Sequence, residues 1–121
     1  MAEKLLFMGT HGPEEPERAT IPFVMATAAQ ASDVEVVIGL QADGVVLAKE
    51  GVAEEIAAPA FPPLKQLLDM YLEAGGKILV CGPCIKSRGI NPESDFIAGA
   101  TVVNAATFVK EATEATNVLV Y

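Results

Sequence analysis

Short apolar runs recur along the chain, separated by segments rich in glycine, proline or charged residues. A continuous apolar run with β-branched members is typical of a strand that is covered on both faces. The first run, KLLFMG, closes on a glycine, and the third, KILVC, leads directly into Gly-Pro. The pattern predicts five strands, over residues 4–9, 34–40, 77–81, 101–104 and 117–121.

Between these runs, apolar residues recur at spacings of three and four, which is the period of an amphipathic helix. The clearest stripe lies in residues 63–76, where Leu64, Leu67 and Leu68 share one face. Gly75 and Gly76 supply the stop after it, because glycine readily adopts the left-handed conformation that ends a helix. Further helices are predicted over residues 16–31 and 105–115, with a short one between residues 44 and 51.

Strands that alternate with helices over short connections predict parallel pairing and right-handed crossovers. We therefore expect an α/β, flavodoxin-like fold, with a mainly parallel five-stranded sheet and helices on both faces. Residues 1–121 show no linker or repeat and form a single domain in this interpretation. The expected strand order is 2-1-3-4-5.

In open α/β sheets, chemistry gathers at the carboxyl ends of the strands, beside the point where the winding reverses. In the expected order, this point lies between the first and third strands. The loops that follow them contain THGPEEPE and CGPC. We therefore expect His11 to lie near both thiols of the second loop.

The charge balance narrows the range of partners. Eight Lys and Arg against sixteen Asp and Glu give a net charge of −8, which repels nucleic acid and anionic membranes. No apolar stretch is long enough to span a membrane, and we expect a cytoplasmic protein. Hydrophobic residues make up 51% of this small chain, which favours a buried interface between copies, as in a homo-oligomer.

The tetrapeptide CGPC places Cys81 and Cys84 at the end of a predicted strand and at the start of a possible helix. Unpaired N–H groups at such a position stabilise a thiolate, which is the reactive form of cysteine. Lys86 and Arg88 add positive charge nearby, although Lys86 alone is typical of a solvated surface residue. These features favour chemistry at the pair over two small residues in a turn.

Three chemical interpretations of the pair are open. CGPC is the thioredoxin active-site tetrapeptide, but Val80 stands where thioredoxins carry tryptophan, and too little chain follows the motif for that fold. A reversible disulfide between Cys81 and Cys84 is nevertheless chemically reasonable. A zinc site needs four ligands, and His11 is the only histidine that could join the thiols. A sulfur carrier is the third interpretation.

The sulfur-carrier interpretation comes from a resemblance. CGPCIKSRGI carries a cysteine seven residues before Arg-Gly, and this arrangement resembles the DsrE/DsrF-like family, which includes TusD-type sulfur-relay subunits. GPEEPERATIPFVMATAA resembles the first loop and helix of that family, and DVEVVIGLQADGVVLAKEG resembles its second strand and turn. PLKQLLDMYLEAGGKILVCGPC resembles the helix and strand that deliver the cysteine, so that residues 4–91 take part.

The resemblance implies a flavodoxin-like fold, assembly into oligomers and persulfide transfer, with sulfur donor and acceptor proteins or small persulfides as partners. On this mapping, Cys81 is the sulfur acceptor, and Arg88 belongs to the Arg-Gly pair after it. Cys84 departs from the relay subunits and is expected to act as a second or resolving thiol. No metal and no cofactor are expected.

Other polar residues near these loops also have candidate roles. His11 is a candidate proton acceptor or donor-steering group. The glutamates of the first loop are expected to form a solvated or helix-starting cluster. Asn104 either lines the same cleft or caps the next helix. The competing class is a non-catalytic oligomeric module that binds a ligand or partner at this edge.

Overall fold

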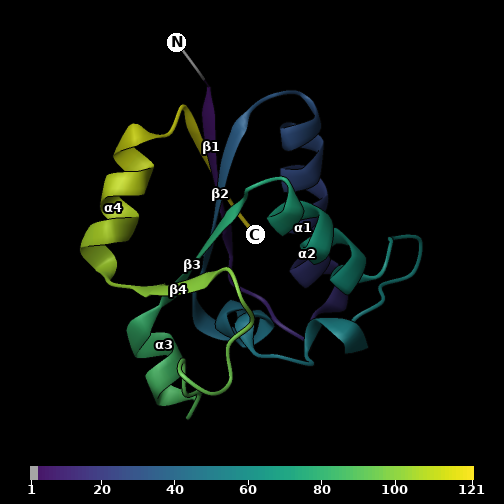
Figure 1. Cartoon of the computed structure of the whole chain (residues 1–121), viewed down its shortest axis with the longest axis vertical. Helices are drawn as coiled ribbons and strands as arrows, with labels where there is room; N and C mark the ends of the chain where they lie inside the picture. Colours follow the sequence, from purple (N-terminus) through teal and green to yellow (C-terminus); the bar gives the residue numbers. More distant parts are fainter. Residues whose placement is uncertain (1–2) are drawn as a thin grey trace.

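The computed structural model describes residues 3–121 and confirms the α/β class. All paired strands run parallel in one sheet of order β4-β3-β2-β1-β5 (Figure 1). The strands are β1 (Lys4–Gly9), β2 (Glu35–Leu40), β3 (Lys77–Cys81), β4 (Ala100–Val103) and β5 (Asn117–Val120).

The expected strand order, 2-1-3-4-5, is wrong. It places β2 at an edge, whereas β2 lies in the centre between β1 and β3. Every β2 residue after Glu35 is buried, so an edge position would expose apolar surface that is covered here. The two edges are instead taken by β4 and β5, whose residues are mostly half-buried or exposed.

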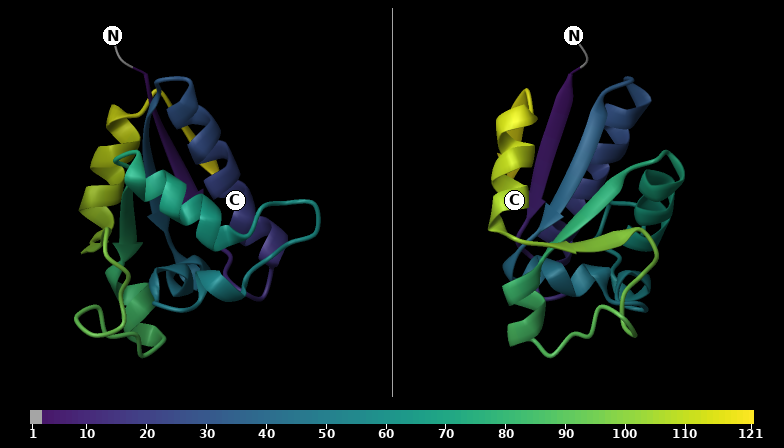
Figure 2. Two further views of the ribbon diagram at one scale, coloured as in Figure 1. Left: turned by 45° about the vertical axis from the view of Figure 1, so that its right-hand side comes forward. Right: turned by 60° about the vertical axis from the view of Figure 1, so that its left-hand side comes forward.

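Helices cover both faces of the sheet. Figures 1 and 2 show α1 (Pro16–Ala31) and α2 (Leu64–Glu73) on one side and α4 (Ala105–Glu114) on the other. The expected short helix between residues 44 and 51 is a 3₁₀ helix, η1 (Ala42–Ala48), and it starts slightly earlier. Two further short elements are η2 (Ala53–Glu55) and α3 (Gly82–Ser87). Within residues 3–121, no helix is both long and apolar enough to cross a membrane.

The larger core lies beneath α1 and α2 and is fixed by the buried side chain of Tyr71. Its hydroxyl accepts a hydrogen bond from the Ile38 amide at 3.1 Å and donates one to the Lys77 carbonyl at 2.6 Å. Its ring meets Phe23 edge-to-face at a centroid distance of 6.1 Å. Tyr71 therefore ties α2 to β2 and to the start of β3, the strand that leads to the cysteines.

A smaller core lies under α4, where Phe108 is the one buried residue of that helix. Gly39 makes this packing possible, because a side chain there would overlap both Met8 and the Phe108 ring. Cys81 is half-buried at the end of this apolar layer, and it also contacts the larger core. The fold thus places Cys81 where both cores end.

Candidate functional site

The cysteine pair lies at the carboxyl end of β3. Cys81 is the last residue of this strand and also the N-cap of α3. Pro83 falls in the first turn of α3, where the missing N–H of proline costs no hydrogen bond. The sequence Cys-Gly-Pro-Cys therefore turns the chain from strand to helix and brings the second thiol back over the first.

The two thiols are free and in direct contact. Cys84 Sγ donates a hydrogen bond to Cys81 Sγ at 2.8 Å, and both side chains are half-buried. The backbone amide of Ala42 donates to Cys84 Sγ at 3.3 Å. Ala42 lies in the segment that we call the β2–η1 loop, residues 41–44, which runs from the end of β2 into the start of η1. The site is therefore a short chain of hydrogen bonds, from Ala42 through Cys84 to Cys81.

The loop that supplies this amide has an unusual backbone. Ala42 has φ +50°, in the left-handed region that residues with a side chain rarely adopt. Such a conformation persists only where the surroundings fix it. The Gln41 amide donates to the Gly9 carbonyl at 3.0 Å, and Gly44 packs so closely that a Cβ would overlap the same carbonyl oxygen. The end of β1 thus holds the loop from one side.

Arg88 holds the loop from the other side. Its Nη2 lies 2.9 Å from Asp43 Oδ1, and its Nη1 donates to the Cys84 carbonyl at 3.1 Å. Arg88 therefore joins η1 to α3 close to the pair, as its sequence position predicted, but its charge is already paired with a carboxylate. Lys86 is exposed and has no salt bridge within residues 3–121.

The pKa of Cys81 shifts in the direction opposite to the one expected from the sequence, which predicted a stabilised thiolate. Burial raises the pKa of Cys81 above its ordinary value, and Cys84 raises it further, because a second ionisable sulfur in contact competes with Cys81 for negative charge. The Cys84 backbone amide and the Arg88 guanidinium lower this pKa, but they are outweighed. Because α3 has only six residues, its dipole is small, and partial burial decides the sign of the pKa shift of Cys81.

These opposing influences give a prediction. Replacing Cys84 with serine removes the neighbouring ionisable thiol, so the pKa of Cys81 should fall and its alkylation near neutral pH should accelerate several-fold. The matched variant Arg88→Gln removes a lowering influence and should slow alkylation. The pH dependence of iodoacetamide labelling at Cys81, followed by mass spectrometry, measures the pKa of Cys81 in each variant. Shifts of the same sign in the two variants would contradict this account.

His11 is not placed beside β3 in the way expected, because β2 separates β1 from β3. Its Nδ1 lies 3.2 Å from the Thr10 hydroxyl, which donates to the Tyr121 carbonyl at 2.6 Å, beyond the end of β5. Within residues 3–121, no hydrogen bond joins His11 to either cysteine. The role of His11 as a proton acceptor or donor-steering group is not tested by these contacts and stays a prediction.

The other polar candidates, Glu14 and Asn104, make hydrogen bonds to backbone amides close to them in sequence. Both carboxylate oxygens of Glu14 accept the Gly12 amide, at 2.9 and 3.0 Å, which stabilises the loop before α1. Asn104 accepts the Thr107 amide at 3.1 Å and thereby caps α4. Of the two interpretations of Asn104, the cap is the one observed. In residues 3–121, no three His, Cys, Asp or Glu side chains gather as metal ligands would.

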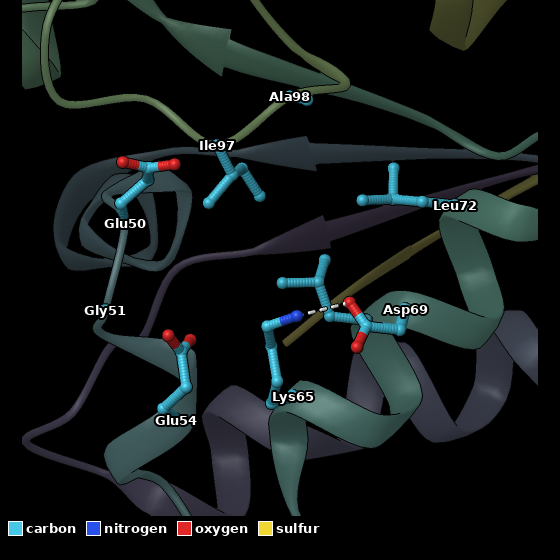
Figure 3. A pocket seen from close by; sticks show the side chains of 9 residues that line it. Glu50, Gly51, Glu54, Lys65, Asp69, Leu72, Ile97 and Ala98 are labelled. Carbon is cyan, nitrogen blue, oxygen red and sulfur yellow. Dashed lines mark hydrogen bonds and ion pairs between the residues drawn. The ribbon is translucent and has the colours of Figure 1, made fainter.

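A cavity of about 500 Å³ lies apart from the cysteines, beside α2 (Figure 3). Its lining includes an apolar wall around Leu68, together with Glu50 and Glu54. Lys65 Nζ, also in the lining, lies 2.6 Å from Asp69 Oδ1. Neither cysteine is among the lining residues, so the chemistry of the thiols is not carried out in this cavity.

Sequence reasoning missed the contribution of the β2–η1 loop. Asp43-Gly44 is typical of a turn, but no sequence pattern identifies Ala42 as a hydrogen-bond donor to a thiol. Its role depends on a backbone conformation imposed by residues distant in sequence.

Comparison with known proteins defines the class of this chain. The model of the DsrE/DsrF-like family matches residues 3–121. The chain therefore belongs to the DsrE/DsrF-like family, and this membership points to a sulfur-relay or related role.

Relatives and solved structures agree with this assignment. The chain is 35% identical over 107 residues to the uncharacterized protein MJ0760 of Methanocaldococcus jannaschii, covering 88% of this chain but only 38% of that longer protein. It is 33% identical over 112 residues to the uncharacterized protein MK0008 of Methanopyrus kandleri, covering 93% and 88% of the two chains. Its fold is similar to that of the ychN protein from E. coli, with a TM-score of 0.81 at 17% identity and coverage of 98% and 99%. A similar fold is found in MTH1491 from Methanobacterium thermoautotrophicum, with a TM-score of 0.72 at 15% identity and the same coverage.

Proposed function

We propose that this protein is a sulfur-accepting protein, in which Cys81 takes a sulfane sulfur from a donor and holds it as a persulfide. The main observation in support of this proposal is the position of Cys81. It lies at the carboxyl end of β3, half-buried and in contact with a second free thiol. Membership of the DsrE/DsrF-like family supports sulfur as the cargo. Transfer to or from a partner protein belongs to the same proposal.

The uptake step conserves atoms and charge. The Cys81 thiolate attacks the outer sulfur of a donor persulfide, forming Cys81–S–SH, and the donor leaves as a thiolate. The Cys84 backbone amide and the Arg88 guanidinium favour negative charge at Cys81, and both remain near a persulfide anion formed there. Because the pKa of Cys81 is raised, we expect uptake to accelerate as the pH rises from neutral.

Association between copies forms part of the proposal. Val118 and Val120 of the edge strand β5 are exposed, and so is Val109 of α4. Exposed valines on an edge strand favour burial against another chain. We propose a homo-oligomer that acts in the cytoplasm and meets sulfur donor and acceptor proteins or small persulfides there.

The test uses the Cys84→Ser variant, in which a sulfur on Cys81 has no intramolecular thiol to react with. One equivalent of a low-molecular-weight persulfide should add one sulfur atom, about 32 Da by intact mass, and a reductant should remove it. Cys81→Ser is the matched control and should add none. Absence of a reducible sulfur adduct in Cys84→Ser with any persulfide donor would refute the proposed function.

A thiol–disulfide redox protein is the second candidate, because both thiols are free and their sulfur atoms are 2.8 Å apart. This candidate predicts a Cys81–Cys84 disulfide that exchanges with dithiols but never carries extra sulfur. The same mass measurement separates the two functions.

A further inference from the structure

The distance between the sulfur atoms has a consequence for any persulfide formed on Cys81. Cys84 Sγ lies 2.8 Å from Cys81 Sγ, the atom that becomes the inner sulfur of the persulfide. Well-oriented intramolecular groups react as if present at concentrations on the order of 10⁵ M or more. A partner protein cannot approach such a concentration, so Cys84 competes strongly for the persulfide.

The surroundings of Cys84 hold its sulfur in place for this attack. The Ala42 amide donates a hydrogen bond to Cys84 Sγ at 3.3 Å and so restrains the position of this sulfur atom. The donor is fixed because Ala42 occupies the left-handed region with φ +50°, held by β1 on one side and by the Asp43–Arg88 ion pair on the other. Strain of this kind is concentrated at functional sites.

We infer that Cys84, positioned by the Ala42 amide, is a resolving thiol, and that the protein thereby reduces a bound persulfide to hydrosulfide. This inference rests on the proposed function, since it begins from Cys81–S–SH. It assigns Cys84 a catalytic role and Ala42 a positioning role. The class of substrate is a persulfide, and the second product is an internal disulfide.

The step balances as follows. The Cys84 thiolate attacks Cys81 Sγ, the bond between Cys81 Sγ and the outer sulfur breaks, and the outer sulfur leaves as hydrosulfide with its proton. The sulfane sulfur gains two electrons, and the two cysteine thiols lose two electrons as they form the disulfide. A cellular dithiol must reduce that disulfide before the next turnover, whereas a single turnover needs no reductant.

The test is a single turnover without reductant, in which the protein receives one equivalent of glutathione persulfide. We expect wild type to release about one equivalent of hydrosulfide and to lose both free thiols, with a mass about 2 Da lower. Cys84→Ser should retain the added sulfur and release almost no hydrosulfide. These three readouts are made by intact mass, thiol titration and sulfide assay.

The alternative outcomes are distinct. A stable sulfur adduct on wild type, with Cys84 still free, would overturn this inference and leave the proposed function intact. No adduct in Cys84→Ser would overturn the proposed function. A Cys84→Ser protein that carries the whole glutathione group, and not one sulfur, would show attack at the inner sulfur of the donor and would also overturn the inference.

Asp43→Ala tests the positioning role. It removes the ion pair with Arg88 that holds the start of η1 on one side, so the Ala42 amide is fixed less firmly against Cys84. We expect hydrosulfide release to slow several-fold, about the effect of weakening one hydrogen bond, while sulfur uptake does not slow. Asp69→Ala, which removes a comparable exposed ion pair on α2, is the matched control and should alter neither step. Equal slowing of uptake and release in Asp43→Ala would contradict the positioning role.

Discussion

Cys81→Ser is expected to abolish sulfur uptake, with at least about a hundredfold loss relative to wild type. In this account, the Sγ atom of Cys81 forms the new bond to the transferred sulfur. A serine hydroxyl is too weakly ionised to replace it. The measurement is the initial rate at which a low-molecular-weight persulfide is consumed, together with the mass of the protein.

Cys84→Ser provides the contrast for this prediction. It should keep the uptake step, because the thiol that it removes acts only after sulfur has arrived. The variant pair thus separates the acceptor from the resolving thiol. Retained uptake in Cys81→Ser with loss in Cys84→Ser would exchange the two roles and contradict the assignment.

Gly44→Ala is expected to cause the largest loss of stability among substitutions near the site. A Cβ at this position would overlap the Gly9 carbonyl oxygen, a backbone atom that cannot move without disturbing β1. We expect the free energy of unfolding to fall by about 3 kcal/mol, as in overpacked sites. Urea denaturation followed by circular dichroism measures this change.

Gly82→Ala is the matched control for Gly44→Ala, because it lies at the neighbouring strand end. Its Cβ would meet Val102 and the Val103 carbonyl at 3.4 Å, which is an ordinary contact. Gly82→Ala should therefore change the free energy of unfolding little. If both variants unfolded at the same urea concentration, the close packing of the β2–η1 loop against β1 would be disproved.

Local sequence pattern was sufficient to predict the five strands and the three longer helices of this fold. Continuous apolar runs marked the strands, and the stripe on α2 with Gly75 behind it marked the clearest helix; Gly75 indeed has φ +88°. Strand order was not predictable in the same way, because it depends on which strands can be covered on both faces. The buried run of β2 carried that signal, since a strand with no polar position after Glu35 is poorly suited to an edge.

The site was predictable only in part. Cys81 and Cys84 could be recognised from their spacing and their place at a strand end, and the structure brings their sulfur atoms into contact. The Ala42 amide could not be recognised, because its direction comes from a left-handed backbone fixed by β1 and Arg88. The sign of the Cys81 pKa shift also depends on burial, which no local motif specifies.

The role of Cys81 as sulfur acceptor is tested most directly by a rapid-quench experiment on wild type. After a brief reaction with a persulfide, the protein is alkylated and digested with trypsin, which cuts after Lys77 and Lys86 and so releases both cysteines in one peptide. Fragment ions from cleavage between the cysteines then locate the extra sulfur. The account predicts that it appears first on Cys81; first appearance on Cys84, or on neither cysteine, would contradict it.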